Sequence, residues 1–300
     1  MSSYLQQLEF DRFVEGDFGL VESLRCREGE CHVSFVDIER GVLGQTRPRG
    51  IYTRDVAPMV AFAQSIGEHG FLFAAGRRIG FSPSEEVSHW SEPLLPESKR
   101  FNDGAVDSAG RLVIGTLSLD SDGSSLENQL LLLDSDQCMY PIRQKIGLSN
   151  GIAVSPDNGD LFHVDTYNST IHRIPLDSVS GEYREPEMFH RFKQEENPDG
   201  LLLLETGDLL VALWGDGTLV RIDSGGQELE RVRVPPTFPT SVCICNTCGE
   251  LWLGNAAQPR GKGLQTVLSG GVWRAHTLMR QVPQLEWRQM QVEGIQLSVK

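Results

Sequence analysis

Acidic and amide side chains recur at a nearly constant distance before a glycine in this 300-residue sequence. Asn150 stands nine residues before Gly159, and Asp199 stands eight residues before Gly207. Comparable positions before other glycines are occupied by Glu22, Asn102-Asp103 and Thr240-Ser241. Oxygen donors of this kind, without histidine or cysteine among them, are the ligands that a hard divalent cation prefers. Two carboxylates and one amide, Glu22, Asp199 and Asn150, would also balance the charge of such an ion.

The glycines belong to a repeat in which a turn glycine precedes a run of strand-forming residues. Its copies, of which the first is weaker, begin at Gly29, Gly70, Gly110, Gly159, Gly207 and Gly249. They are spaced 41, 40, 49, 48 and 42 residues apart. Such periods are typical of propeller blades, because one four-stranded sheet cannot bury both faces unless it stacks on neighbouring sheets. Six copies predict an all-β fold, a six-bladed β-propeller with four-stranded antiparallel blades around a central channel.

Short strand candidates fill the segments between the copies. They are bounded by clusters of Asp, Ser, Gly and Pro and comprise residues 130–133, Thr170–Ile174 and Thr218–Ile222. No segment sustains the apolar period of a helix between a good N-cap and a terminal glycine. No linker interrupts the period, so we expect residues 1–300 to form a single domain. Within it, we expect 272–300 to be a ring-closing strand plus tail that completes the last blade with the N-terminal segment.

The position of the polar residues follows from the repeat. If each repeated glycine marks the hairpin between the first and second strands of a blade, the polar residues lie on the innermost strands. Equal offsets then place their side chains at one height around the axis, where several carboxylates and amides converge. The alternative is that Asn and Asp merely cap the turn that enters each inner strand. Matched offsets in four blades favour a site over this alternative.

The overall charge restricts the class of partner. The chain has 27 Lys and Arg against 41 Asp and Glu, a net charge of −14, and no basic cluster, so we expect no nucleic-acid partner. The apolar runs are far too short to span a bilayer, and the N-terminus lacks the basic and apolar regions of a signal peptide. We therefore expect no membrane association and a cytoplasmic location. The expected partner is a small-molecule substrate, and the expected assembly is a monomer or weak homo-oligomer.

Three of the six cysteines crowd into one short stretch, at Cys243, Cys245 and Cys248. They could form a soft-metal cluster, but no second cysteine pair and no Cys-His pair stands at zinc-finger spacing. We therefore expect free thiols that are mostly buried in a strand.

One stretch fits a hydrolase motif by residue type only. Residues 147–151 match G-x-S-x-G, which marks a nucleophilic serine on a strand-to-helix turn. Residues 152–154 are strand formers followed by a turn, so the pattern does not predict a nucleophile at Ser149. His163 and His172 lie inside expected strands, and we expect them to pack or to face solvent rather than to act in catalysis.

Four stretches resemble successive blades of one protein family. Arg100-Phe-Asn-Asp-Gly104, followed by Asp107, Gly110-Arg111 and Gly115-Thr116, is similar to the R-x-N-D-G…D…G-R…G-T signature of the SMP-30/gluconolactonase/LRE family. Further blades of that family are similar to the stretches around Ser149-Asn-Gly151, Pro198-Asp-Gly200 and Pro239-Thr-Ser241. The similarity runs from about residue 19 to about residue 273.

The resemblance implies a six-bladed propeller with one catalytic divalent metal ion on the channel axis, often calcium or zinc, with magnesium or manganese also considered. Residues that match the family's metal ligands are Glu22, Asn150 and Asp199. The position of Asp199 also matches the proposed base. Residues that match substrate-contacting positions are Arg100, Asn102 and Asp120.

The resemblance also implies an activity. It is that of a metal-dependent carboxylic ester hydrolase, lactonase-like, in which the metal polarises the carbonyl of a lactone or related cyclic ester and Asp199 activates water. One departure from the family pattern widens the range of possible reactions. The family usually follows its first Glu with Gly/Ser-Pro-x-Trp, whereas Glu22 is followed by Ser23-Leu24-Arg25. Two alternatives therefore stay open, a non-hydrolytic isomerase or cyclase of a biosynthetic pathway that uses the same metal site, and a non-catalytic binding propeller.

Overall fold

The computed structural model of the chain describes residues 4–27, 29–48, 50–66, 70–82, 89–119, 126–134, 136–157, 159–257, 270–285, 287 and 298–299. Regular structure in these residues is almost entirely β-strand, with one short 3-10 helix, η1 (Leu5–Gln7). No helix in this part of the chain is long and apolar enough to cross a membrane. The strands form six sheets and group into two compact units, three sheets in each.

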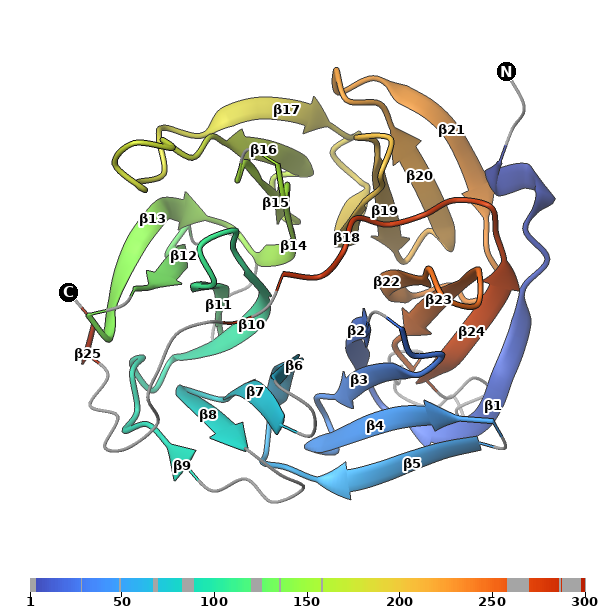
Figure 1. The fold of residues 1–300 in the computed structure, drawn as a ribbon, viewed down its shortest axis with the longest axis horizontal. Helices are drawn as coiled ribbons and strands as arrows, with labels where there is room; N and C mark the ends of the chain where they lie inside the picture. Colours follow the sequence, from blue (N-terminus) through green and yellow to red (C-terminus); the bar gives the residue numbers. More distant parts are fainter. Residues whose placement is uncertain are drawn as a thin grey trace. The chain divides into compact units, whose positions relative to one another are not determined.

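Unit 1 is made of Met1–Val60 and Glu195–Val282. Its first sheet contains β2 (Val21–Cys26), β3 (Val33–Asp37), β4 (Val42–Arg47) and β5 (Gly50–Asp55). Its second sheet contains β18 (Asn197–Leu203), β19 (Leu209–Trp214), β20 (Thr218–Ile222) and β21 (Glu228–Arg233). Its third sheet, whose strands lie side by side in Figure 1, contains β22 (Pro239–Cys245), β23 (Glu250–Asn255), β24 (Gly270–His276) and β1 (Asp11–Phe18).

Unit 2 is made of Ala61–Gln194 and Pro283–Lys300. One of its sheets contains β6 (Val60–Ile66), β7 (Gly70–Ala75), β8 (Arg78–Ser82) and β9 (His89–Trp90). A second contains β10 (Lys99–Val106), β11 (Leu112–Ser118), β12 (Asn128–Leu133), β13 (Cys138–Ile146) and β25 (Ser298–Val299). The third contains β14 (Ser149–Val154), β15 (Leu161–Asp165), β16 (Thr170–Ile174) and β17 (Glu187–Arg191).

The repeated glycines make the turns between the first and second strands of the sheets. Five of them, Gly29, Gly110, Gly159, Gly207 and Gly249, have φ between 66° and 83°. Side chains with a Cβ atom rarely adopt this left-handed conformation, and glycine adopts it without steric cost. The remaining repeat glycine begins β7. The glycine pattern in the sequence therefore marks the turn between the first and second strands of each sheet.

Apolar side chains of facing sheets pack together and form the core of each unit. In unit 1, Leu24 of the first sheet belongs to one buried cluster with Cys243 of the third. In unit 2, Phe62 of the β6–β9 sheet belongs to one cluster with Leu112 of β11. Because both faces of a sheet are covered in this arrangement, β7 and β14 are buried at every position.

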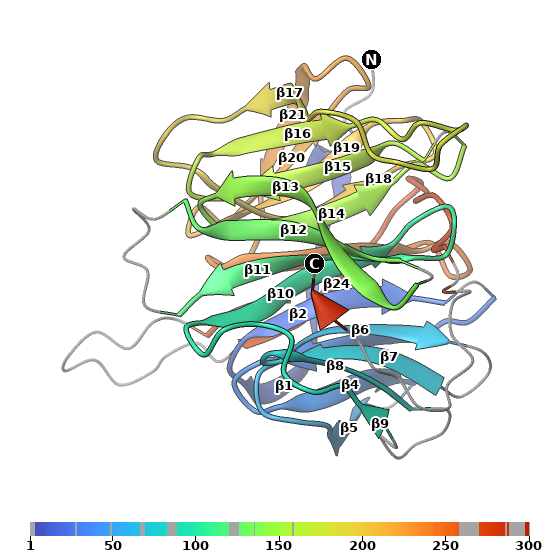
Figure 2. The ribbon, with the colours of Figure 1, turned by 90° about the vertical axis from the view of Figure 1, so that its left-hand side faces the viewer.

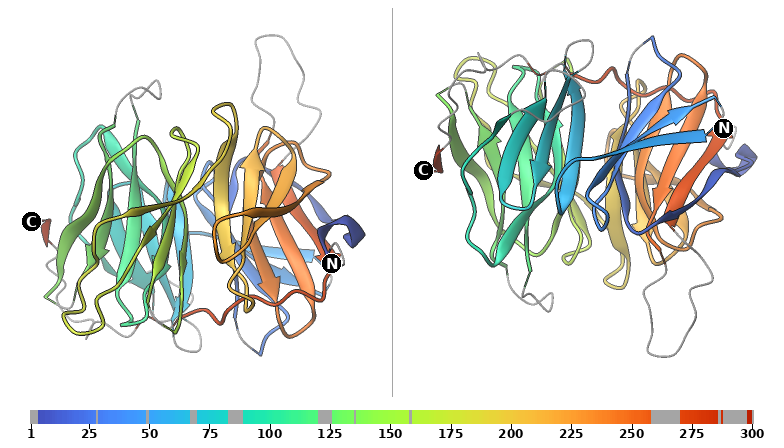
Figure 3. Two further views of the ribbon diagram at one scale, coloured as in Figure 1. Left: turned by 90° about the horizontal axis from the view of Figure 1, so that it is seen from above. Right: turned by 90° about the horizontal axis from the view of Figure 1, so that it is seen from below.

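The N-terminal strand completes the sheet that contains the C-terminal strands of unit 1. β1 pairs antiparallel with β24, with Asp11 opposite Arg274 and Phe18 opposite Gly270. Figure 3 shows the blue N-terminal segment beside the orange and red strands of this sheet. In unit 2, β25 pairs in parallel with β13 and forms the edge of that sheet. Figure 2 shows the red C-terminal arrow beside the green strand β13.

Six four-stranded antiparallel blades in an almost helix-free chain are the architecture of a six-bladed β-propeller, so the predicted fold class is confirmed. The expected strands Thr170–Ile174 and Thr218–Ile222 are β16 and β20, and residues 130–133 lie in β12. The single domain over residues 1–300, with 272–300 as closing strand and tail, stays a prediction.

Candidate active site

The first strand of a sheet is irregular at the polar residues that the sequence offsets single out. In five sheets the pairing of this strand with the second strand shifts register. The shift lies between two positions along the inner strand, which are Glu22 and Arg25, Phe101 and Gly104, Ser149 and Ile152, Pro198 and Leu201, and Pro239 and Val242. Such β-bulges turn side chains to new directions and are common beside active sites. Equal offsets in the sequence therefore correspond to equivalent, bulged positions in five strands.

In unit 2, four polar side chains form one hydrogen-bonded chain across two sheets. Nη1 of Arg100 donates to Oδ1 of Asn102 over 2.8 Å. Nδ2 of Asn102 donates to Oδ1 of Asn150 over 2.5 Å, and Nδ2 of Asn150 donates to Oγ1 of Thr166 over 2.9 Å. The arginine and the two asparagines are each 8% exposed. This series of hydrogen bonds fixes the orientation of Asn150. The carboxamide oxygen of Asn150 has a second lone pair with which to bind a cation.

In unit 1, the strand that contains Glu22 is bonded to β22. Oγ1 of Thr240 donates to the backbone oxygen of Val21. The backbone N–H of Leu24 donates to Oγ of Ser241 over 2.9 Å. These two bonds hold the bulged part of β2, on both sides of Glu22, against the polar stretch of the neighbouring sheet.

The strand that contains Asp199 approaches the same stretch. A Cβ atom at Gly200 would lie 2.3 Å from the backbone oxygen of Thr240, so a glycine is needed for this close contact. Asp199 itself is 7% exposed. Asp199 and Glu22 therefore lie on strands that both contact the stretch Thr240-Ser241.

Residues 20–257 match the model of a family described as the SMP-30/Gluconolactonase/LRE-like region. The chain belongs to this family. The recognition of the family from the four sequence stretches is confirmed.

Several curated proteins align with this chain at modest identity. A protein of Sulfolobus acidocaldarius without an assigned function is 31% identical over 215 residues, which make up 69% of this chain and 77% of that protein. The pentonolactonase XacC of Haloferax volcanii is 29% identical over 241 residues, 78% of this chain and 80% of that protein. Two further relatives are matched over only about half of their own length, 50% and 52%.

The fold is also that of solved structures. A calcium-binding protein, regucalcin, of Agrobacterium tumefaciens superimposes with a TM-score of 0.82 at 18% identity, covering 94% of this chain and 98% of that one. At this identity the likeness shows a shared fold.

The residues that the family resemblance assigns to a site occur in both units of this chain. Glu22 and Asp199 belong to unit 1, and Asn150 belongs to unit 2, where it is joined to Arg100 and Asn102. Two carboxylates and a carboxamide oxygen are a donor set that fits a hard cation. The assignment of these residues as one ligand set stays a prediction. The remaining predicted substrate contact, Asp120, lies outside the described residues.

The segment after Glu22 departs from the family pattern at Leu24, and the backbone of Ser23, between these two residues, is unusual. Ser23 has a φ of 54° and is 1% exposed. A non-glycine residue in this region costs about 1–3 kcal/mol, and such strain is concentrated at functional sites. The bulge of β2 and the left-handed Ser23 together determine the direction in which Glu22 leaves the strand.

A serine-histidine pair in unit 2 has the wrong polarity for nucleophilic catalysis. Oγ of Ser149 lies 2.7 Å from Nε2 of His163, and Nη1 of Arg143 lies 2.7 Å from Nδ1 of the same ring. Arginine can only donate, so Nδ1 accepts and the proton is on Nε2, which donates to Ser149. A general base would have to accept the serine proton at this nitrogen. Burial, and then the charge of Arg143, also hold the pKa of His163 well below its usual value.

The sequence analysis assigned no role to Thr166, which ends the hydrogen-bonded series of unit 2. A signal was present, because Asp165, the last residue of the buried strand β15, and Thr166 form a polar pair. Asp165 is fully buried, and its Oδ1 accepts from the backbone N–H of Gly147 over 3.1 Å. The pair therefore holds the turn before β14 and orients Asn150 at the same time.

Proposed function

We propose that this protein is a divalent-metal-dependent hydrolase that opens a lactone or a related cyclic ester of small, polar character. The proposal rests on one observation: the hydrogen-bonded chain from Arg100 to Asn150 joins a substrate-contacting position of the family directly to a metal-ligand position. The activity named for the pentonolactonase XacC supports a lactone as the substrate class.

Glu22, Asn150 and Asp199 would hold the cation, with water in its remaining positions. A donor set made only of oxygen atoms suits calcium, magnesium or manganese better than a thiophilic metal, and the structurally similar regucalcin is described as calcium-binding. When bound, such a cation polarises the carbonyl group of the substrate as a Lewis acid.

Asp199 has the role of general base in this proposal. One of its carboxylate oxygens accepts a proton from water as the water oxygen bonds to the lactone carbonyl carbon. The resulting carboxylic acid then gives that proton to the ring oxygen as the carbon–oxygen bond breaks. The product is the open hydroxy acid, and Asp199 returns to its ionised form.

Arg100 and Asn102 have the role of orienting the substrate. The guanidinium of Arg100 is held by bonds from Nη1 to the backbone oxygen of Phe101 and to Asn102, each of 2.8 Å. Its five N–H donors are set in a rigid fork that matches hydroxyl and carboxylate oxygens. Because Arg100 is nearly buried, bonds from it to a substrate form in surroundings with little competing water.

A lactone screen with isotope labelling tests the proposal. Purified protein is stripped with a chelator and assayed on sugar lactones and other cyclic esters with calcium, zinc, magnesium or manganese in oxygen-18-labelled water. We expect ring opening that depends on the metal and places one labelled oxygen in the product carboxylate. Absence of ring opening with every metal and every ester would contradict the hydrolase assignment.

A second candidate is an isomerase or cyclase that uses the same residues. It is favoured by Ser23-Leu24-Arg25, which replaces the family's usual Gly/Ser-Pro-x-Trp beside Glu22 and includes the left-handed Ser23. Such an enzyme would yield a product without oxygen from solvent, so the labelling experiment separates the two candidates.

A further inference from the structure

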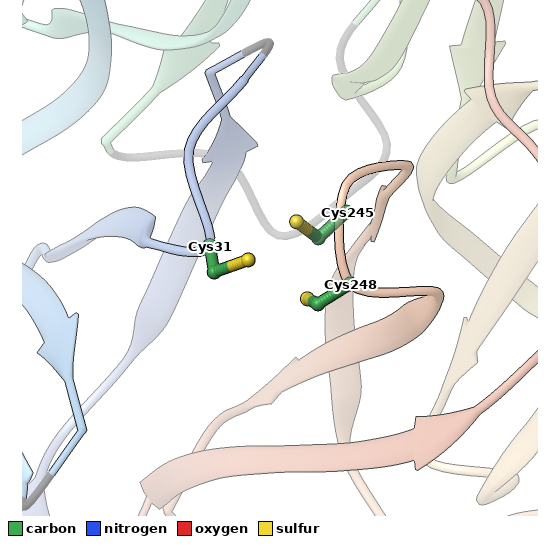
Figure 4. Close-up of side chains that lie close together, drawn as sticks. All are labelled: Cys31, Cys245 and Cys248. Carbon is green, nitrogen blue, oxygen red and sulfur yellow. The ribbon is translucent and has the colours of Figure 1, made fainter.

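Three cysteines from two hairpins of unit 1 meet at one point. Cys245 ends β22, Cys248 lies in the turn that leads to β23, and Cys31 lies just before β3. Their sulfur atoms all lie within 4.8 Å of one another. Figure 4 shows the three side chains directed toward the same space. The sequence analysis considered only the first two of these cysteines, together with Cys243.

The contact between these hairpins is part of the packing of two sheets. The turns belong to two copies of the same repeat, with Gly29 in one and Gly249 in the other. Sγ of Cys245 lies 3.1 Å from the backbone oxygen of Glu30, which directly precedes Cys31. Cys26 and Cys243 belong, together with Cys245, to the buried apolar cluster that joins the two sheets. The three sulfur atoms are therefore held together by the fold of unit 1.

A carboxylate is anchored beside the thiols. Oε2 of Glu250 lies 3.5 Å from Sγ of Cys248. Its other oxygen, Oε1, accepts from Nη1 of Arg274 over 3.0 Å, and the side chain is almost buried. Around a tetrahedral zinc ion, a thiolate sulfur and a carboxylate oxygen would be roughly 3.6 Å apart, given bond lengths of about 2.3 and 2.1 Å. The observed separation of Glu250 and Cys248 is close to this value.

We propose that Cys31, Cys245 and Cys248 bind a zinc ion, with the carboxylate of Glu250 as the fourth ligand. Thiolates select soft or borderline cations, and a Cys-x-x-Cys turn with a third cysteine from another segment is a common arrangement of zinc ligands. Sulfur atoms around a tetrahedral zinc ion are roughly 3.8 Å apart, so the three thiols need only a small side-chain adjustment from the observed arrangement. Glu250, which contacts Cys248 but lies outside the group of atoms within 4.8 Å, must turn its carboxylate further toward the other two sulfur atoms.

The site is separate from the oxygen donors of the proposed active site and has a structural role. It joins the β2–β3 hairpin to the β22–β23 hairpin, and thus links the part of unit 1 that precedes residue 61 to the part that follows residue 194. Zinc binding would release thiol protons and add its binding free energy to the stability of unit 1.

Titration of the reduced, full-length, metal-stripped protein with cobalt and then with zinc tests the site. Cobalt bound by thiolates gives a sulfur-to-metal charge-transfer absorption that oxygen ligands do not give, and zinc should remove it at one equivalent. Cys31→Ser and Cys248→Ser should each weaken binding by at least about 100-fold, and Glu250→Gln by about 10-fold. Cys138→Ser, which changes a buried cysteine of unit 2, is the matched control and should leave the absorption unchanged.

Two further measurements keep the result independent of the proposed function and of the folding of any variant. Asp199→Asn removes a proposed oxygen ligand and should leave the cobalt–thiolate absorption intact. In the wild-type protein, zinc should protect the exposed Cys31 from alkylation, as measured by peptide mass spectrometry. The proposal is overturned by a reduced protein without the absorption, by an unchanged cobalt affinity of Cys31→Ser, or by equal alkylation of Cys31 with and without zinc.

Discussion

Two sets of potential ligands lie toward opposite ends of the same strands of unit 1. The oxygen donor Glu22 is near the start of β2, and Cys31 follows the end of that strand. In β22, the polar stretch Thr240-Ser241 is near the start and Cys245 is the last residue.

The two sets differ in how the fold produces them. Polar residues at a bulge occur in five sheets, so the repeat itself generates equivalent positions for an oxygen-rich site. The thiols occur at a single contact between two hairpins. Hard and soft donors are thus kept apart along the strands, and this separation allows two different cations to be bound without competition.

The largest expected effect comes from a substitution that disrupts only the proposed oxygen ligands. Asp199→Asn keeps the shape of the side chain and one potential ligand oxygen but removes the basic carboxylate. Turnover of a lactone substrate should fall by at least about 100-fold with the fold retained. Steady-state kinetics at saturating metal measure this loss, and Asp157→Asn at an exposed position is the matched control. Turnover near that of the wild type would show that Asp199 is not the base.

The next largest effect comes from a substitution that disrupts only the proposed thiolate ligands. Zinc at 100 times its dissociation constant should stabilise the wild-type protein by about 2.7 kcal/mol. Thermal unfolding with and without zinc should therefore show a higher midpoint for the wild type and, because binding is at least about 100-fold weaker, a response of at most about 0.4 kcal/mol for Cys31→Ser. An equal zinc response in both proteins would locate the stabilising ion elsewhere.

Glu22→Gln sharpens the comparison within the oxygen set. The substitution removes a ligand charge but no proposed base, so it should weaken metal affinity by about 10- to 100-fold. Activity measured against metal concentration should be largely restored by excess metal, in contrast to Asp199→Asn. Failure of excess metal to restore activity would argue against Glu22 as a ligand.

Arg100→Gln separates substrate binding from metal binding in unit 2. Loss of the guanidinium should raise KM by about 10-fold, because a charged hydrogen bond contributes on the order of 1.5–3 kcal/mol, part of which glutamine replaces. Metal affinity should change little. An equal loss of metal affinity would mean that Arg100 acts mainly by holding Asn102 against Asn150.

The last expected effect is on the stability of unit 2 at acid pH and leaves both ligand sets in place. Burial, followed by the charges of Arg143 and Arg191, lowers the pKa of His172 to about 4, and His163 is shifted in the same direction. A lowered pKa in the folded state means that stability is complete above pH 6.5 and is lost as the pH falls from 6.5 toward 4. Each histidine contributes a slope of at most about 1.4 kcal/mol per pH unit. Urea midpoints between pH 7 and pH 5 measure it, and His172→Gln should reduce the slope; an unchanged slope would contradict this role.

The sequence predicted those features that depend on local pattern. Turn glycines followed by strand formers gave the six sheets, and the strands β16 and β20 have the expected bounds. Offsets from the glycines identified the bulged positions, since a bulge is a feature of one strand and its neighbour. The presence of Asn150 and Asp199 at such positions could therefore be predicted.

Contacts between distant segments could not be predicted in this way. Cys31 meets Cys245 although 214 positions separate them, and no local pattern marks the first cysteine as a partner of the second. The tautomer of His163 is likewise set by Arg143, which lies 20 residues earlier on β13 of another sheet. Such contacts follow from how sheets stack, and neither propensity nor periodicity encodes that stacking residue by residue.

The pairing of β1 with β24 has a consequence for the folding of the nascent chain during its synthesis on the ribosome. Asp11 emerges early, but its partner Arg274 is added 263 residues later, and at 5–20 residues per second this takes roughly 10–50 s. During that interval β1 lacks β24, the strand with which it pairs, whereas the contiguous segment Ala61–Gln194 of unit 2 can already form most of its three sheets, with only the short strand β25 still to be added. Unpaired strand edges promote aggregation. The edge of β1 is therefore exposed to aggregation until β24 has been synthesised.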